Sequence, residues 1–325
     1  MSDHARPEAQ RPRILITGVT GGIGRHLAEH LKSAGAVVYG LQRRPPSAQS
    51  PAVIDEKHIY VGDLLDTNSL CETLDAVCPT EIYHLAGAID NDTDEGYINY
   101  ETNVTGTIRL LNAIRNVGLT PKILLASSSA VYGRSVKIPI KEESELCPLT
   151  HYAVSKVAQE MVAIQYHYTG GLSIVRARTF NVIGPGLSPS LLCSGLARQI
   201  AYSEKNGKRS IQVGNIQPHR DYTDVRDVVR AYELLMRSGK PGDVYNVSSM
   251  TSHSVKECLD VLLAKSKVPL VVEIDKSRYR SAEIEIQVGD ASKISKLIGW
   301  GPKIPFEQSL EDSLNNWRQV LQEGS

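Results

Sequence analysis

Short apolar runs alternate with amphipathic segments through the first half of the chain. The runs have the length and composition of buried strands, and they cover residues 13–18, 36–41, the start of 59–66, 81–87, 122–129 and 172–181. Between them, apolar residues recur at helical spacing at 24–35, 68–77, 103–118 and 151–170. Strands that alternate with helices form parallel sheets with right-handed crossovers and helices on both faces. The pattern therefore predicts an α/β fold with a doubly wound parallel sheet.

After Asn181 the alternation becomes irregular. The remaining pattern predicts a Gly/Pro loop at 182–190 and a loop followed by a helix at 220–239. It predicts further helices at 191–208, 254–266, 292–300 and 309–321. Strands are predicted at 210–215, 243–249 and 269–275. The strand at 210–215 is expected to be isolated. We therefore expect a sheet domain of 12–181 plus 217–249, a smaller α+β lobe of 182–216 plus 250–325, and a disordered arm at 1–11.

Composition excludes several classes of protein. Of 325 residues 41% are hydrophobic and 22% charged, and 36 basic residues balance 36 acidic ones, so neither a nucleic-acid groove nor a membrane surface is expected. No apolar run approaches the roughly 20 residues that span a bilayer. The five scattered cysteines and nine histidines show no metal-ligand spacing and no disulfide framework. We expect a cytoplasmic protein without a metal site.

A glycine-rich turn joins the first strand to the first helix, with the spacing TGxxGxxG from Thr17 to Gly24. The first glycine permits a tight turn, the second lets the backbone approach a pyrophosphate, and the third lets helix and strand pack closely. A turn with only a structural role is the alternative. The turn predicts a Rossmann-type dinucleotide site with the residues Gly18, Thr20, Gly21, Gly22, Ile23 and Gly24.

The end of the second strand indicates which dinucleotide is bound. An acidic residue there would bind the ribose hydroxyls of NAD, whereas arginine favours the 2′-phosphate of NADP. This chain has Arg43 and Arg44 and no acid at that point. A solvated basic turn is the alternative, but the guanidinium groups favour NADP(H) over NAD(H).

Tyr152 and Lys156 form a YxxxK pair on a predicted helix. Four residues of separation place both side chains on one face, where the ammonium can stabilise the phenolate and make Tyr152 a usable acid/base. Ser127, Ser128 and Ser129 end the preceding strand, and a hydroxyl there could polarise the same substrate oxygen. Chance pairing on a helix, and serines that act only as caps, are the alternatives.

Together these segments resemble the extended short-chain dehydrogenase/reductase family. The resemblance rests on TGVTGGIG, GDL at 62–64, YHLAG at 83–87, SSSAVYG at 127–133 and YAVSK at 152–156. It implies a catalytic set of Ser128, Tyr152 and Lys156. It also implies that the cofactor is contacted by Asp63, Leu64, Leu85, Ala86, Gly87, Asn103, Tyr152 and Lys156. Relatives commonly form homodimers through two helices per subunit, here 103–116 and 152–168.

Later motifs are similar to GDP-mannose 4,6-dehydratases and closer still to GDP-4-keto-6-deoxy-D-mannose reductases. They are RTFNVIGPG at 178–186, QVGN at 212–215, RDYTDVRD at 220–227, VYNVSS at 244–249 and RSAE at 280–283. The resemblance implies a nucleotide-diphosphate sugar as the substrate, contacted by Ser128, Ser129, Asn181, Arg220, Arg280 and Glu283. A surface ion pair of Arg220 with Asp221 or Asp224 is the alternative for that arginine.

One position departs from the dehydratase pattern. Dehydratases of this group carry an acidic residue one or two positions after the catalytic Ser or Thr, where this chain has Ser129 and Ala130. Neither can act as the base for elimination of water. Many of the related reductases also keep an acid there, so its absence alone does not identify a reductase. From the later motifs and the two arginines we expect an NADPH-dependent reductase of a GDP-4-keto-6-deoxyhexose. The open alternatives are a 4-epimerase or dehydratase that recycles its cofactor, and a non-catalytic NADP-binding scaffold.

Overall fold

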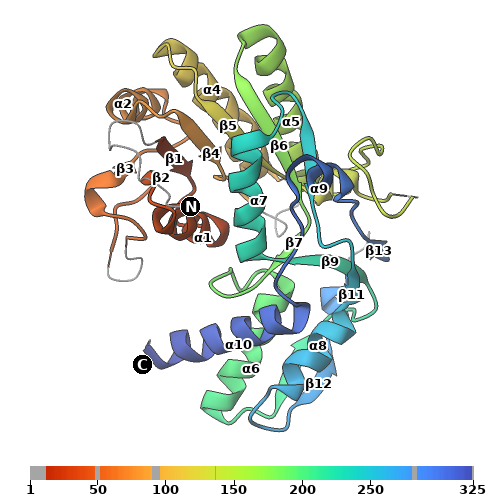
Figure 1. Cartoon of the computed structure of the whole chain (residues 1–325). Coiled ribbons are helices and arrows are strands. Elements are labelled where there is room, and N and C mark those ends of the chain that lie inside the picture. Colours follow the sequence, from red (N-terminus) through yellow and green to blue (C-terminus); the bar gives the residue numbers. More distant parts are fainter. Residues whose placement is uncertain (1–11, 48–51, 90–95, 136, 280–283, 324–325) are drawn as a thin grey trace, which may run out of the picture. The chain divides into compact units, whose positions relative to one another are not determined.

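The structure, a computed structural model, describes residues 12–47, 52–89, 96–135, 137–279 and 284–323. Its larger sheet has seven strands in the order β10-β6-β5-β4-β1-β2-β3 (Figure 1). They are β1 (Arg13–Thr17), β2 (Val37–Gln42), β3 (Ile59–Val61), β4 (Glu81–His84), β5 (Lys122–Ser128), β6 (Ser173–Thr179) and β10 (Val244–Val247). The ladders β1–β2, β1–β4, β2–β3 and β4–β5 are parallel. The strand order reverses at β1, so the predicted doubly wound parallel sheet is confirmed.

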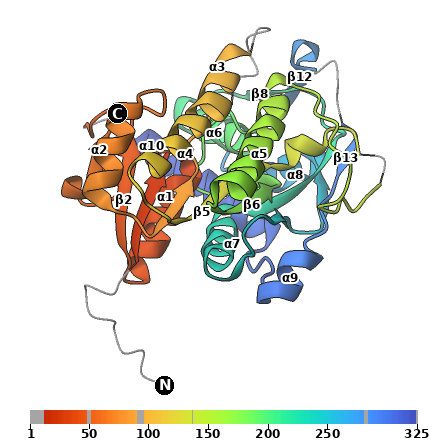
Figure 2. The same cartoon turned by 90° about the horizontal axis from the view of Figure 1, so that it is seen from above.

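Helices cover both faces of this sheet. α2, α4 and α5 pack on one face, and α1 lies on the other (Figures 1 and 2). The helical elements are α1 (Gly22–Ser33), α2 (Thr67–Val77), α3 (Tyr97–Asn99), the π-helical segment η3 (Tyr100–Thr105), α4 (Gly106–Asn116) and α5 (His151–Gly170). The ends of α5 follow from its sequence, because Thr150 Oγ1 accepts the amide of Ala153 at 3.1 Å and Gly171 takes the left-handed conformation.

The helix predicted to begin at residue 103 begins earlier and is not regular. Helical backbone starts at Tyr97, passes through η3, and continues as α4 to Asn116. Asn103 lies inside the π segment rather than at a helix start. A π turn accommodates one extra residue per turn, which the apolar period does not reveal.

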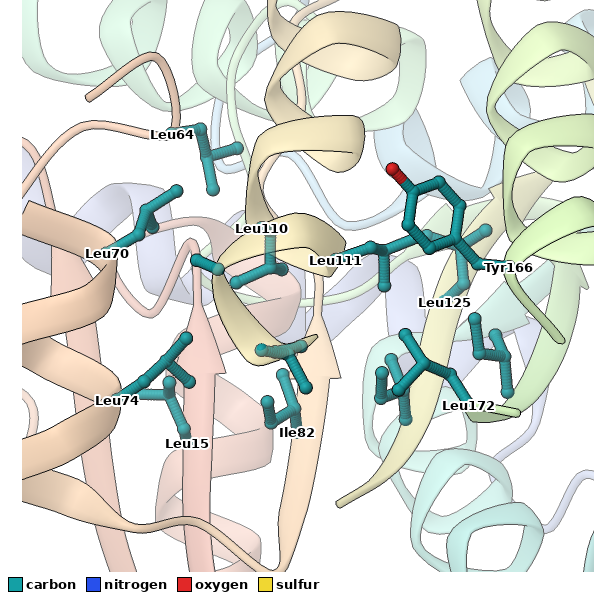
Figure 3. Packing of buried hydrophobic residues seen from close by; sticks show 14 of the residues in the cluster. Leu15, Leu64, Leu70, Leu74, Ile82, Leu110, Leu111, Leu125, Tyr166 and Leu172 are labelled. Atoms are coloured by element: carbon teal, nitrogen blue, oxygen red, sulfur yellow. The ribbon is translucent and has the colours of Figure 1, made fainter. Parts of the chain in front are cut away.

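A continuous apolar core fills the space between this sheet and the helices on its α4 face. Leu15 and Ile82 on β1 and β4 are fully buried and pack with Leu74 of α2 and Leu110 of α4 (Figure 3). Burial of each such side chain stabilises the folded state by about 1.5–3 kcal/mol. This core fixes the strand ends that carry the predicted cofactor residues.

The chain divides into two compact units, and the division differs from the predicted lobes. Unit 1 comprises Met1–Ser127, Thr150–Ala177 and Tyr232–Val244, and unit 2 comprises Ser128–Leu149, Arg178–Ala231 and Tyr245–Ser325. The segment after β5 was expected in the sheet domain but belongs to unit 2. There Tyr132 Oη donates to the side chain of Asn246 at 2.7 Å, and the Asn246 amide donates to the carbonyl of Ile140 at 2.9 Å.

Unit 2 contains short strands and several helices. The strands are β7 (Asn181–Ile183), β8 (Ser210–Val213), β9 (His219–Asp224), β11 (Ser252–Ser254), β12 (Val271–Ile274) and β13 (Ile286–Gln287). The helices are α6 (Leu192–Asn206), α8 (Val255–Ala264), α9 (Ser292–Ile298) and α10 (Phe306–Glu323), and α7 (Val225–Ser238) begins in this unit. Buried side chains of α6, α8 and α10 share one apolar core with β8.

Two predictions for this region were wrong. The segment at 220–224 was expected to be a loop, but it forms β9, which pairs with β7, β11 and β13. Its sequence, RDYTD, is polar and shows no apolar alternation, so only its distant partners identify it as a strand. The strand predicted at 210–215 is not isolated either, because β8 pairs in parallel with β12.

Candidate active site

The glycine turn has the geometry of an anion cradle. Gly18 has a positive φ of 75°, and a Cβ there would lie 2.7 Å from the Ala86 amide nitrogen. A Cβ at Gly24 would lie 2.2 Å from the carbonyl oxygen of Gly18, so helix α1 packs against the turn at a distance that only glycine permits. α1 begins at Gly22 with no side-chain cap, which leaves the amides of its first turn for a ligand. These residues fit a dinucleotide pyrophosphate.

The two arginines follow β2 directly. Both are exposed, and the Gln42 side chain donates to the carbonyl of Arg44 at 2.6 Å, which holds the turn they occupy. Their guanidinium groups are thus presented at the end of the strand next to β1, where the ribose of a dinucleotide is expected.

Asp63 and Leu64 follow β3 in the same sheet. Asp63 Oδ1 accepts the amide of Leu65 at 2.9 Å, and the Asp63 amide donates to Ser69 Oγ at 3.3 Å. Leu64 is buried in the apolar core of unit 1 (Figure 3). The structure therefore gives both residues a part in shaping this strand end, and their contact with adenine stays a prediction.

The loop after β4 carries Leu85, Ala86 and Gly87, and Asn103 holds it from η3. The Asn103 side chain accepts the amide of Ala88 at 2.8 Å and donates to the carbonyl of Ala88 at 3.0 Å. It also donates to Ser155 Oγ on α5 at 2.9 Å. Asn103 is buried, so it positions the loop, and a direct contact with the cofactor stays a prediction.

Lys156 and Tyr152 lie one turn apart on α5, as predicted. The Lys156 side chain is buried, and its Nζ donates to the carbonyl of Ala126 and to Gln159 Oε1, each at 2.7 Å. Burial lowers the pKa of Lys156 to about 8, and the nearby Glu160 carboxylate opposes this change. Tyr152 is partly exposed on the same face. An ammonium one helical turn from a phenol can stabilise the phenolate, which would suit proton transfer.

The three serines after β5 have different surroundings. In unit 1, Ser127 Oγ donates to Glu160 Oε1 at 2.5 Å, and Glu160 pairs with Arg176 of β6 at 3.1 Å. In unit 2, Ser128 Oγ accepts the amide of Ala130 at 3.2 Å and so caps a short 3₁₀ turn. That contact leaves the hydroxyl proton of Ser128 available as a donor to a substrate oxygen. Both the cap and the predicted catalytic role are therefore compatible at Ser128.

Ser129 is buried, and its contacts are to Gln287. Its Oγ lies 3.4 Å from Gln287 Oε1, and Gln287 Nε2 donates to the Ser129 carbonyl at 3.1 Å. A substrate contact of Ser129 stays a prediction.

Asn181 and Arg220 lie on the paired strands β7 and β9 of unit 2. Arg220 Nη1 donates to the carbonyls of His219 and Ile284, at 2.8 and 2.6 Å. Asp221 and Asp224, which were considered as ion-pair partners of Arg220, form their hydrogen bonds with other residues. Asp221 accepts the amides of Ser249, Met250 and Gly289, and Asp224 accepts from Arg226 and Ser309. Arg280 and Glu283 lie outside the described residues.

The residues that surround the lysine were missed by the sequence reasoning. Gln159, Thr107 and His84 are buried and hydrogen-bonded in series next to Lys156. One signal was available, because Gln159 follows Lys156 by three positions and shares its helix face. The other two come from segments far away in the sequence and had no local signal.

No group of three His, Cys, Asp or Glu side chains that could hold a metal ion occurs within the described ranges. In the same ranges, no helix is both long and apolar enough to cross a membrane.

The fold, the glycine cradle and the Tyr152–Lys156 pair define a dinucleotide-binding protein of the short-chain dehydrogenase/reductase class. A sequence profile described as GDP-mannose 4,6 dehydratase matches residues 15–313. The chain belongs to this family of the extended short-chain dehydrogenases/reductases, which confirms the predicted resemblance.

Individual relatives cover nearly the whole chain. GDP-6-deoxy-D-mannose reductase of Pseudomonas aeruginosa is 33% identical over 96% of this chain and 99% of its own length. GDP-mannose 4,6 dehydratase 1 of Arabidopsis thaliana is also 33% identical, over 94% of this chain and 89% of its own. The predicted enzyme class, a nucleotide-sugar-modifying enzyme that uses NAD(P), is confirmed.

Solved structures give the same fold with either dinucleotide. RMD from Pseudomonas aeruginosa complexed with NADPH has a TM-score of 0.82 and 31% identity, and the match covers 95% of this chain and 99% of that one. UDP-glucose 4-epimerase of Thermus thermophilus complexed with NAD has a TM-score of 0.83 and 25% identity, over 94% and 98%.

Proposed function

We propose that the protein reduces the C4 keto group of a GDP-4-keto-6-deoxyhexose with NADPH. The observation that carries the proposal is the buried Lys156, fixed at 2.7 Å to the Ala126 carbonyl and to Gln159 and one turn from Tyr152. This is the arrangement of a proton donor for a carbonyl. The similarity to a GDP-6-deoxy-D-mannose reductase over both full lengths supports the substrate.

Each catalytic residue has one role in this proposal. NADPH, when bound, supplies the hydride that reduces C4. Tyr152 donates a proton to the oxygen that becomes the hydroxyl, and Ser128 hydrogen-bonds to that oxygen. Lys156 holds Tyr152 in its reactive state and binds the nicotinamide ribose.

The choice of NADP(H) over NAD(H) rests on Arg43 and Arg44. Two guanidinium groups at the end of β2 suit the 2′-phosphate, and no carboxylate accompanies them in the sequence of that turn. A structural neighbour that binds NADPH supports this choice, whereas another binds NAD.

The diphosphate of the sugar nucleotide is assigned to Asn181 and Arg220, with Arg280 and Glu283 at the ribose or phosphates. A guanidinium is the natural partner of a diphosphate, and Arg220 is held in place by two carbonyl oxygens. Ser128 and Ser129 complete the proposed substrate set near the sugar.

A second candidate function is a 4-epimerase or dehydratase that keeps its cofactor. The 33% identity to a plant GDP-mannose 4,6 dehydratase favours it. Against the dehydratase, the positions after Ser128 hold Ser129 and Ala130, which supply no carboxylate for elimination of water.

We also propose a homodimer formed by α4 and α5. Val154, Met161 and Tyr168 recur every seven residues on α5 and are 39%, 45% and 75% exposed. Residues at this spacing share one helix face, and an exposed apolar helix face is typical of an interface.

The experiment that tests the reaction follows the near-ultraviolet absorbance of NADPH with enzymatically prepared GDP-4-keto-6-deoxymannose, and with NADH in parallel. Stoichiometric loss of NADPH with formation of the reduced sugar is the expected result. A constant NADPH signal with a changed sugar would establish the epimerase or dehydratase instead. Tyr152→Phe should abolish turnover and retain NADPH binding, and full activity of this variant would remove Tyr152 from the mechanism.

A further inference from the structure

Four buried polar side chains form a hydrogen-bonded series that ends at the catalytic lysine. Thr17 Oγ1 lies 2.8 Å from His84 Nδ1, and His84 Nε2 lies 2.9 Å from Thr107 Oγ1. Gln159 Nε2 donates to Thr107 Oγ1 at 2.8 Å. The four residues come from β1, β4, α4 and α5, and each is no more than 1% exposed. We refer to Thr17, His84, Thr107 and Gln159 as the polar chain.

The donor and the acceptor of each hydrogen bond in the polar chain can be assigned from the neighbouring hydrogen bonds of Thr17 and Thr107. The amide of Ala86 donates to Thr17 Oγ1 at 3.2 Å, so the Thr17 hydroxyl proton is available for His84 Nδ1. The Thr107 hydroxyl donates to the carbonyl of Asn103 at 2.6 Å. Thr107 Oγ1 therefore accepts from His84 Nε2, which places a proton on that nitrogen. Burial lowers the pKa of His84 to about 3, so the imidazole is neutral and its Nδ1 accepts from Thr17.

This direction also fixes the orientation of the Gln159 amide. Because Thr107 Oγ1 accepts, Gln159 must turn its NH₂ group toward Thr107 and its carbonyl oxygen toward Lys156. The resulting Lys156 Nζ to Gln159 Oε1 distance is 2.7 Å. A flipped amide would place two donor groups against each other in a buried site, which is costly.

The ammonium of Lys156 is thereby oriented by two acceptors from different elements. Of its three N–H donors, one is directed to Ala126 O on β5 and one to Gln159 Oε1 on α5. The remaining donor is the one that can serve Tyr152 and the nicotinamide ribose.

We propose that Gln159 is a positioning residue for Lys156, and that Thr107 and His84 orient Gln159 from the elements next to the cofactor turn. This inference rests on the proposed function for the role of Lys156 in catalysis and cofactor binding. It adds that the protonated state and direction of Lys156 depend on the amide of Gln159, a side chain that is fully buried.

The titratable groups that interact electrostatically with Lys156 lie on α5 and β4. Glu160 on α5 raises its pKa, and Glu160 itself pairs with Arg176 on β6 and accepts from Ser127 on β5. His84 on β4 is neutral, because burial and the Lys156 charge lower its pKa to about 3. A new charge at position 159 would therefore act on Lys156 directly.

Two substitutions at Gln159 should move the pH dependence in opposite directions. Gln159→Met keeps the size of the side chain and removes the acceptor, so the ammonium is less stable and activity should be lost at a lower pH than in the wild type. Gln159→Glu keeps an acceptor and adds a negative charge, so activity should persist to a higher pH. At neutral pH, Gln159→Met should lower kcat about 10- to 100-fold, and Gln159→Glu should lower it less.

The measurement is the pH profile of kcat and of the NADPH dissociation constant for both variants. Gln165→Met is the matched control, because Gln165 is an exposed glutamine on the same helix that bonds to Thr169. It should behave as the wild type. Thr107→Val, which releases the Gln159 amide, should reproduce part of the Gln159→Met effect.

Opposite shifts in the two Gln159 variants would support the inference. Wild-type rates in Gln159→Met, or shifts of both folded variants in the same direction, would overturn it. The NADPH titration requires no sugar substrate. If the wild type is inactive on the assigned sugar but the Gln159 variants bind NADPH with a shifted pH dependence, then only the assigned substrate is wrong. If the variants do not fold, the tautomer of His84 is measured in the wild type from the ¹⁵N chemical shifts of its ring. A proton on Nε2 would support the assigned polar chain, and a proton on Nδ1 would contradict it.

Discussion

Lys156 Nζ lies 2.7 Å from the carbonyl oxygen of Ala126, two residues before Ser128 at the end of β5. The lysine of the YxxxK pair is thus tied to the backbone of the strand that ends in the predicted catalytic serine. A main-chain acceptor cannot be removed by substitution, so this contact persists in variants of the surrounding side chains. It makes the lysine itself the informative position to change.

Lys156→Met should lose activity and become more stable. Burial lowers the pKa of Lys156 from 10.5 to about 8, which corresponds to a cost on the order of 3 kcal/mol for the charged form in the folded state. Below pH 8 the folded and unfolded states are both protonated and the cost is fully present. It is relieved as the pH rises from about 8 to 10.5, because the unfolded state then binds more protons than the folded state.

We therefore expect kcat to fall at least about 100-fold in Lys156→Met. The unfolding free energy, measured in urea, should equal or exceed that of the wild type at pH 7, and the difference should narrow toward pH 10. A variant that is clearly less stable than the wild type at pH 7 would contradict this assignment.

His84 should make the protein sensitive to acid. Burial, together with the Lys156 charge, lowers the pKa of its imidazole from 6.5 to about 3. Between these values the unfolded state binds a proton that the folded state does not, so stability is lost as the pH falls from 6.5 toward 3. The contribution is at most about 1.4 kcal/mol per pH unit.

The test is urea unfolding of the wild type and His84→Asn at pH 6.5 and pH 4.5. The variant lacks the titrating group, so the stability advantage of the wild type should shrink at the lower pH. An advantage that is equal at both pH values would show that His84 titrates normally.

The Glu160–Arg176 pair should be important for stability. The two side chains are 3.1 Å apart and largely buried, with 0% and 9% exposure. Glu160→Ala leaves a buried guanidinium without this carboxylate and should cost about 3–5 kcal/mol, whereas the double variant Glu160→Leu/Arg176→Met should cost less. Thermal and urea unfolding measure both.

An exposed pair provides the control for that comparison. Lys256 and Asp260 on α8 are 2.6 Å apart, but both side chains are more than half exposed. Asp260→Ala should therefore change the unfolding free energy by less than about 1 kcal/mol. A similar loss of unfolding free energy in Glu160→Ala and Asp260→Ala would mean that burial does not determine how much an ion pair contributes to stability.

Local sequence predicted the parts of this enzyme that local chemistry determines. Residue spacing within a short segment defines each of these features: the glycine turn, the arginines after β2 and the Tyr152–Lys156 pair. The alternation of strands and helices likewise predicted the doubly wound sheet. These features could be predicted because sterics and helix periodicity act over a few residues.

What was missed depends on contacts between distant segments. Strand β9 was predicted to be a loop because its polar sequence forms a strand only against β7, β11 and β13. The polar chain was missed because Thr17, His84 and Thr107 are adjacent only after the sheet and α4 have formed. The two compact units also differ from the predicted lobes at the segment after β5, where Tyr132 forms a hydrogen bond with Asn246.

The proposed dimer should depend on the outer face of α5. Met161→Glu combined with Tyr168→Glu places two charges on a face that would be buried between subunits, and unpaired buried charges are strongly unfavourable. We expect a dimer for the wild type and a monomer for the double variant in sedimentation velocity. Leu297→Glu, at an exposed apolar residue of α9, should leave the dimer intact. A monomeric wild type would refute the proposed interface.

The cofactor preference should depend on Arg43 and Arg44. Each guanidinium can form charge-assisted hydrogen bonds with the 2′-phosphate of NADP(H), which NAD(H) lacks. The double variant Arg43→Gln/Arg44→Gln should weaken NADPH binding by about tenfold or more. NADH binding by the same variant is the internal control and should change little. Equal weakening for both dinucleotides would mean that the arginines stabilise the turn after β2 rather than select the phosphate, and the assignment to NADP(H) would then lose its basis.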